Sequence, residues 1–133
     1  DDCIIIGAGP AGLTAAIYLA RFHLKIRLFD CGTSRASWIP CTHNHAGYPN
    51  GINGKELLAL MLAQAEKYGA TREQAEVTKL EPIDGGFAVT VGVGGAQLGA
   101  RAVLLATGVV NNQPAMDKEA HDEALARGLL RYC

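Results

Sequence analysis

The opening thirty residues combine a glycine-rich turn with an acidic residue at a set distance after it. The turn is Gly7-Ala8-Gly9-Pro10-Ala11-Gly12, and Asp30 lies 18 residues after Gly12. In such a turn the first glycine permits a tight bend and the second lets backbone approach a pyrophosphate, while the third lets a helix pack closely on a sheet. A carboxylate at this distance accepts hydrogen bonds from ribose hydroxyls. The pattern predicts a dinucleotide site.

The segments around this turn are those that such a site needs. Cys3-Ile4-Ile5-Ile6 is apolar throughout, which is typical of a strand buried on both faces. Good helix formers fill residues 13–21, and a second apolar run at 26–29 stops at Asp30. A pyrophosphate would then meet the unpaired amides and positive dipole end of the helix. The alternative, a glycine-rich turn in an ordinary α/β protein, requires strand, helix and acid to coincide by chance.

Composition narrows the class of protein. A chain of 133 residues has room for one domain with a core, and 49% apolar with 19% charged residues is typical of a soluble globular protein. The net charge of −1 predicts no nucleic-acid partner, and no apolar run approaches the roughly 18 residues that cross a membrane. Four scattered cysteines do not form a secreted disulfide framework, so we expect a cytoplasmic protein.

Residues 31–53 show no helical period, and we expect an extended loop. Cys41, His43 and His45 alternate along it, so zinc coordination is one interpretation, but no fourth ligand stands out and we predict no metal site. Another alternative is that one of the histidines assists proton transfer, but we expect ordinary loop histidines held by hydrogen bonds. Cys31, directly after the acid, is expected to be a small buried residue.

A second helix is predicted over residues 54–68. Asn53 is a suitable N-cap, Glu56 completes a capping box, and Gly69 stands where a C-cap glycine belongs. Helical spacing predicts a sheet-facing side made of Leu57, Leu58, Met61, Leu62 and Ala65.

From residue 71 the apolar period changes to two. Three strands are expected around residues 77–80, 87–91 and 97–98, joined by glycine turns as an antiparallel meander. The apolar run 102–106 then suits a strand that rejoins a buried parallel sheet. The predicted fold class is therefore α/β: a Rossmann-like, three-layer ββα domain whose parallel sheet has an antiparallel β-meander crossover.

The last part of the chain is predicted to be a connector. Residues 111–128 are polar with helical patches, and His121 with its acidic neighbours is expected to form a solvated helical face. Leu129-Leu130-Arg131-Tyr132 is typical of the start of a strand, directly before Cys133. We therefore expect a fragment of a longer protein.

Several of these segments together resemble the thioredoxin reductase family of flavoproteins. They are the glycine turn, Asp30, Asn44-His45-Ala46-Gly47-Tyr48-Pro49 and Ala106-Thr107-Gly108, and the resemblance covers essentially the whole chain. It implies an FAD-binding domain at residues 1–110. Residues 111–133 would be a connector and the start of an NAD(P)H-binding domain.

The resemblance also implies an activity. Electrons would pass from NAD(P)H through FAD to a Cys-x-x-Cys pair, with Cys133 as its first, catalytic cysteine. A thioredoxin-like protein or a small dithiol would be the partner, and the complete protein would be a homodimer.

Residue by residue, the resemblance implies a set of FAD contacts. The pyrophosphate would be held by Gly7, Ala8, Gly9, Pro10, Ala11 and Gly12, and the adenosine ribose by Asp30. Asn44 would contact the flavin side, and Val77 would meet the adenine through its backbone. Arg35 would reach a flavin oxygen or phosphate. The backbone that closes over the cofactor would be Ala106, Thr107 and Gly108.

Two departures from the family pattern keep alternatives open. Thr33-Ser34-Arg35-Ala36 replaces the usual Gly-Gly-Gln-Leu, and His45-Ala46 replaces tryptophan and proline. The complete protein could instead be an FAD-dependent dithiol oxidase, a ferredoxin-linked reductase, or a non-catalytic nucleotide-binding redox module.

Overall fold

The opening βαβ unit forms as the sequence indicates. The computed structural model describes residues 1–110, 112 and 114–130. Strand β1 (Cys3–Ile6) leads through the glycine turn into helix α1 (Pro10–Arg21), and strand β2 (Ile26–Phe29) follows. The helix begins at Pro10, before the run of good helix formers, because proline suits the first helical turn, where its missing amide leaves no partner unpaired.

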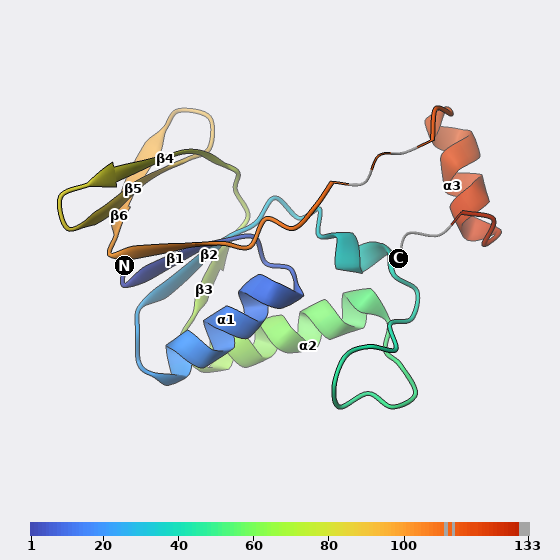
Figure 1. The fold of residues 1–133 in the computed structure, drawn as a ribbon, viewed down its shortest axis with the longest axis horizontal. Coiled ribbons are helices and arrows are strands. Elements are labelled where there is room, and N and C mark those ends of the chain that lie inside the picture. Colours follow the sequence, from blue (N-terminus) through green and yellow to red (C-terminus); the bar gives the residue numbers. More distant parts are fainter. Residues whose placement is uncertain (111, 113, 131–133) are drawn as a thin grey trace.

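A four-stranded parallel sheet forms the middle of the molecule (Figure 1), in the order β3-β2-β1-β7. Strand β3 (Thr71–Glu73) pairs with β2 and was not predicted as part of this sheet. All three of its side chains are exposed, so this edge strand carries no apolar signal.

Strand β7 (Ala102–Leu105) returns to the parallel sheet beside β1, as predicted. Its expected burial is wrong, since Leu104 and Leu105 are 38% and 64% exposed. Among the described residues β7 is the outer strand of the sheet, so no further strand shields its side chains.

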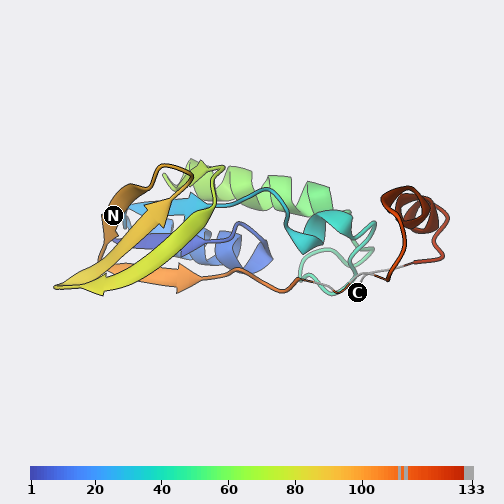
Figure 2. The ribbon, with the colours of Figure 1, turned by 90° about the horizontal axis from the view of Figure 1, so that it is seen from above.

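The predicted antiparallel meander is confirmed. It consists of β4 (Val77–Ile83), β5 (Gly86–Val91) and β6 (Ala96–Ala100). The meander lies against one face of the parallel sheet, and α1 and α2 (Gly54–Lys67) lie side by side against the other (Figures 1 and 2). These three layers are the ββα arrangement expected of the α/β class.

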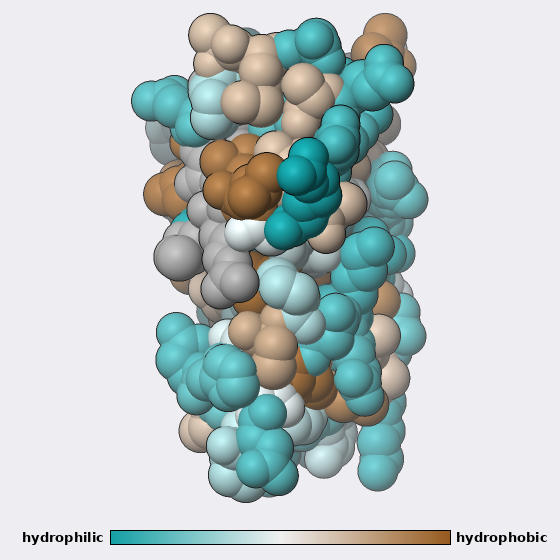
Figure 3. Space-filling view, turned by 90° about the vertical axis from the view of Figure 1, so that its right-hand side faces the viewer, coloured by the Kyte–Doolittle hydropathy of each residue, from teal (hydrophilic) through white to brown (hydrophobic). Residues whose placement is uncertain are grey.

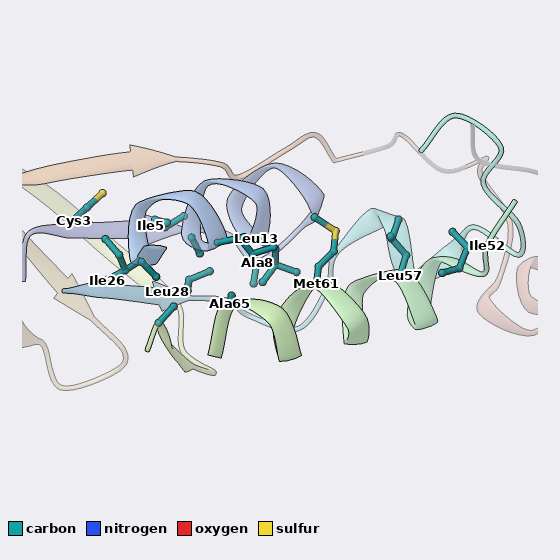
Figure 4. Close-up of a cluster of buried hydrophobic side chains, with 14 residues drawn as sticks. Cys3, Ile5, Ala8, Leu13, Ile26, Leu28, Ile52, Leu57, Met61 and Ala65 are labelled. Atoms are coloured by element: carbon teal, nitrogen blue, oxygen red, sulfur yellow. The ribbon is translucent and has the colours of Figure 1, made fainter. Parts of the chain in front are cut away.

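Two cores follow from the alternation of side chains along β1. Cys3 and Ile5 point into the core shared with α1 and α2 (Figure 4). Ile4 points the other way and packs with Phe29 and Val89 between the two sheets. Because both faces of β1 are covered, the strand is apolar at every position.

Helix α2 is bounded as predicted. The Asn53 side chain accepts hydrogen bonds from the amides of Lys55 and Glu56, and Gly69 follows the helix with a φ of +93°. All five residues of the predicted apolar side are buried or half-buried in the core with the sheet and α1, and the three most buried are Leu57, Met61 and Ala65.

The predicted loop before α2 contains one short helix, η1 (Arg35–Trp38), which the sequence pattern missed. A Cβ at Gly54 would collide with the carbonyl oxygen of Ala36, so η1 can lie directly against the first turn of α2 only because residue 54 is glycine. An isolated antiparallel bridge between Thr42 and Ile52 closes the rest of the loop.

Helix α3 (Lys118–Ala126) lies beyond the carboxyl ends of the sheet strands, away from both cores (Figure 1). The expectation of a solvated face is wrong for His121, which is 8% exposed, whereas the acidic residues around it on the helix are exposed. That end of the molecule is largely hydrophilic, with small separate hydrophobic patches (Figure 3).

The expected strand after α3 is wrong for its first two residues. The amides of Leu129 and Leu130 both donate to the Ala124 carbonyl and fold the chain back on the helix end. The remainder of that predicted strand, with Cys133, lies outside the described residues. Among the described residues, no helix is both long and apolar enough to span a bilayer.

Candidate functional site

The glycine turn is closely packed on both sides. Gly7 has a φ of +106°, and a Cβ there would collide with the carbonyl oxygen of Ala106. A Cβ at Gly12 would collide with the carbonyl oxygen of Gly7. The Ala106 amide also donates to the Ile6 carbonyl at 2.8 Å, which fastens the chain after β7 to the end of β1. These contacts fix the path of the backbone through the turn.

Gly9, by contrast, faces open space. Among the described residues, a Cβ built there has only the Ser34 hydroxyl oxygen near it, at 3.4 Å. Gly9 is also the N-cap of α1, where no side chain caps the helix and the first turn holds no acidic residue. The amides at the start of α1 therefore remain available to an anionic ligand, which the helix dipole would favour.

Asp30 lies directly beside this turn. Its Oδ1 accepts a hydrogen bond from the Ala8 amide at 3.4 Å, and its Oδ2 accepts one from the Gly32 amide at 3.1 Å. The side chain is only 11% exposed. The acid and the glycine turn, 22 residues apart in the chain, thus meet at the carboxyl ends of β1 and β2.

Arg72 is a site residue that sequence reasoning missed. Its Nη2 lies 3.0 Å from Asp30 Oδ2, close enough for a charge-assisted hydrogen bond. Arg72 occupies β3, paired in register with Leu28. The sequence signal for this contact would have been an arginine on a strand next to the one that ends before Asp30. However, β3 has no apolar pattern by which it could be recognised as a strand.

A cavity of about 160 Å³ opens beside Asp30 between the turn, η1 and α2. Asp30, Ser34 and Arg72 give it polar groups, and α1 and α2 give it apolar walls. Since sites for whole ligands of this class occupy several hundred Å³, the cavity suits one part of a dinucleotide.

Arg35 lies in η1, next to the residue that faces Gly9. Its Nε is buried and has no hydrogen-bond partner among the described residues. A buried guanidinium nitrogen without a hydrogen-bond partner destabilises the fold unless a ligand accepts its hydrogen bond. Arg35 is therefore suited to an anion bound near the turn.

The other predicted contact residues are spread over three segments. Thr107 and Gly108 continue from Ala106 past the end of β7 and are exposed. Val77 begins β4, where it packs in the core between the sheets. Asn44 is exposed in the loop before α2 and accepts a hydrogen bond from the Thr42 hydroxyl at 2.6 Å. The structure thus joins the turn to Asp30 and Ala106, whereas the described contacts of Asn44 and Val77 lie elsewhere.

The loop histidines and cysteines do not form one cluster. Cys41 Sγ and His43 Nδ1 lie 2.5 and 2.8 Å from the point that a Cβ of residue 51 would occupy, so they share one side of the loop. His45 instead packs on Tyr48, with ring centroids 5.8 Å apart. Within the part of the chain that the structure describes, no three potential ligands converge on a metal site.

The expectation of a buried Cys31 is wrong, because this residue is exposed. β2 has already ended at Phe29, and the Cys31 side chain turns to Thr33, with Sγ and Oγ1 3.0 Å apart. Cys3 is the buried thiol of β1, and burial raises its pKa.

Comparisons with known proteins agree with this geometry. The thioredoxin reductase of Treponema pallidum (strain Nichols) is 36% identical over 134 residues, covering 99% of this chain and 42% of that protein. That of Mycolicibacterium smegmatis is 43% identical over 112 residues, covering 80% and 34% respectively. The solved thioredoxin reductase of Giardia duodenalis has a TM-score of 0.84 at 30% identity, with 95% of this chain and 40% of that chain covered.

The chain spans less than half the length of these relatives. A family model described as pyridine nucleotide-disulphide oxidoreductase matches residues 1–133. This match covers the whole chain, including the turn, the helix and the acid described above. The chain therefore belongs to the pyridine nucleotide-disulphide oxidoreductase family.

Proposed function

We propose that residues 1–110 are the N-terminal part of an FAD-binding domain in a thioredoxin reductase-like flavoenzyme. The observation that carries the proposal is the hydrogen bond from the Ala8 amide to Asp30, which brings a pyrophosphate-type turn and a ribose-type acid together. The open space at Gly9 and the buried Nε of Arg35 fit an anionic cofactor that passes between them.

In this proposal each part of the site has one task toward the cofactor. The backbone of the turn from Gly7 to Gly12, with Arg35, holds the pyrophosphate. Asp30 accepts from the adenosine ribose, and the Val77 backbone meets the adenine. Asn44 contacts the flavin side. The backbone of Ala106, Thr107 and Gly108 closes over the cofactor.

The rest of the proposal concerns the complete protein. FAD, when bound, accepts electrons from NAD(P)H and delivers them to a dithiol pair. Residues 111–133 would connect to an NAD(P)H-binding domain, with Cys133 as the first cysteine of the pair. The protein would act in the cytoplasm as a homodimer on a thioredoxin-like protein or a small dithiol.

The test begins with the absorbance of the complete purified protein. We expect a flavin spectrum that NADPH or NADH bleaches anaerobically, and a disulfide substrate should restore it. A protein without flavin absorbance after incubation with FAD would contradict the proposal. Oxygen uptake driven by a dithiol, with no bleaching by either nicotinamide, would instead identify an oxidase.

A matched pair of variants tests whether FAD binds at this site. Asp30→Ala should lower FAD affinity by about tenfold or more, because hydrogen bonds to a charged group are lost. Asp84→Ala removes an exposed carboxylate in the turn between β4 and β5 and should leave affinity unchanged. Equal affinities of the two variants would exclude Asp30 as a ribose contact.

A further inference from the structure

The Asp30 carboxylate has little unused capacity as an acceptor. An ionised carboxylate offers two acceptor positions on each oxygen. Oδ2 already accepts from the Gly32 amide at 3.1 Å and from Arg72 Nη2 at 3.0 Å. Oδ1 accepts from the Ala8 amide at 3.4 Å. Of the two oxygens, only Oδ1 therefore keeps a position for an incoming hydroxyl, as judged from the residues that the structure describes.

The contact between Arg72 and Asp30 Oδ2 should persist when a ligand binds. The Asp30 and Arg72 side chains are 11% and 29% exposed, so solvent screens the pair only in part. The guanidinium approaches from β3, which hydrogen-bonds to β2, and the Asp30 amide donates to the Glu73 carbonyl beside it. A neutral ribose hydroxyl is a weaker donor than a guanidinium and would not displace it.

We propose that Arg72 is a positioning residue that makes Asp30 recognise a single hydroxyl of the adenosine ribose. Arg72 occupies Oδ2 and fixes the rotation of the carboxylate, and Oδ1 is then the one acceptor presented to the ligand. The inference rests on the proposed function, because it takes the adenosine ribose of FAD as the group at Asp30. Arg72 itself acts through Asp30 and need not touch the cofactor.

The test compares FAD with two analogues in the complete apoprotein. One carries 2′-deoxyadenosine and the other 3′-deoxyadenosine, and flavin fluorescence reports each dissociation constant at the flavin site. In the wild type, one analogue should bind about tenfold more weakly than FAD, since a hydrogen bond to a charged acceptor is lost. The other analogue should bind within about twofold of FAD, within the ordinary spread of such measurements.

Substitution of Arg72 should change this selectivity. In Arg72→Met the side chain has no donor for Oδ2, so this oxygen opens to the other hydroxyl and both analogues should bind more weakly than FAD. Arg72→Lys keeps a cation for Oδ2 and should retain the wild-type selectivity for one hydroxyl. Arg101→Gln removes a 79% exposed arginine that pairs with Asp2, and this control should behave as the wild type.

The outcomes separate this inference from the proposed function. Equal losses for both analogues in the wild type would overturn it, because both oxygens would then accept from the ribose. Unchanged selectivity in Arg72→Met would overturn it as well, whatever that variant does to stability. A wild-type protein that binds no FAD would overturn the proposed function and this inference together.

Discussion

Gly12 and Gly9 stand three residues apart in the same turn, yet a side chain would meet opposite conditions at the two positions. At Gly12 a Cβ would collide with the backbone of Gly7, which cannot move without shifting the turn. At Gly9 the backbone is extended, with φ −74° and ψ −177°, and the nearest atom is the Ser34 hydroxyl. Structural and ligand-binding roles can therefore be separated by single substitutions.

We expect Gly12→Ala to lower the free energy of unfolding by about 1–3 kcal/mol, the usual effect of overpacking. Gly9→Ala should leave stability within about 0.5 kcal/mol and weaken FAD binding instead, since its methyl group would enter the space left for the pyrophosphate. Urea unfolding and FAD titration of both variants provide the measurement. The same change in stability in both variants would contradict the assignment of a packing role to Gly12 and a ligand-binding role to Gly9.

The described cysteines should differ in reactivity. Cys3 is buried in β1 and burial raises the pKa of its thiol, which lowers the thiolate fraction, whereas Cys31 and Cys41 are exposed. Under native conditions a thiol reagent should label Cys31 and Cys41 first, and Cys3 only on unfolding. Timed labelling followed by peptide mass spectrometry tests this order. Rapid native labelling of Cys3 would show that β1 opens readily.

At the scale of elements, the start of α2 depends on one side chain. Asn53 Oδ1 accepts from the amides of Lys55 and Glu56, and its Nδ2 donates to the Pro40 carbonyl at 3.1 Å. Asn53→Ala should lower the free energy of unfolding by about 1 kcal/mol, the usual loss for an N-cap. Asn50→Ala, an exposed asparagine of the same loop, is the control and should have no measurable effect in thermal unfolding.

The beginning of β1 is tied to its surroundings by Asp2. Its Oδ2 accepts from the Lys25 amide at 2.8 Å and its Oδ1 lies 3.3 Å from Arg101 Nη1, and these contacts, the Lys25 hydrogen bond first, lower the pKa of the carboxyl. A carboxyl with a lowered pKa in the folded state stabilises it above the ordinary value of 3.8 and loses that effect as the pH falls further.

Asp2→Asn should therefore be less stable than the wild type near pH 7, and the difference should shrink below about pH 4. Urea unfolding at a series of pH values measures this difference. A difference that stays constant down to pH 2 would mean that the loss of stability does not come from the charge of the carboxylate.

For the whole molecule, the sequence was most informative where side chains are buried. The all-apolar β1, the cap at Asn53 and the period-two segments specified the layers, because burial and backbone pairing impose those patterns. Two of the errors fall on exposed residues: β3 has no apolar residue, and Cys31 follows the last buried position of its strand. The contact between Arg72 and Asp30 likewise cannot be predicted from one sequence, because it depends on how β3 pairs with β2.

The exposed side of β7 has a consequence for the 133-residue chain expressed alone. Leu105 is 64% exposed on a strand that has no further neighbour among the described residues, and such edges pair with other chains. We expect concentration-dependent association, which Leu105→Lys should reduce. Leu129→Lys, at a 70% exposed position after α3, is the control. Light scattering across a concentration series is the measurement, and equal effects of both variants would exclude β7 as the cause.

The dual role of Asn53 bears on the order in which the chain acquires its structure. One amide group both begins α2 and holds Pro40, fourteen residues before the helix starts. The loop can thus reach its final shape only when the first helical turn exists to orient that amide. Forming that first turn carries the nucleation cost of any helix, and closing the bridge between Thr42 and Ile52 adds a cost in chain entropy. The segment next to the cofactor site should consequently be among the last to become ordered during folding.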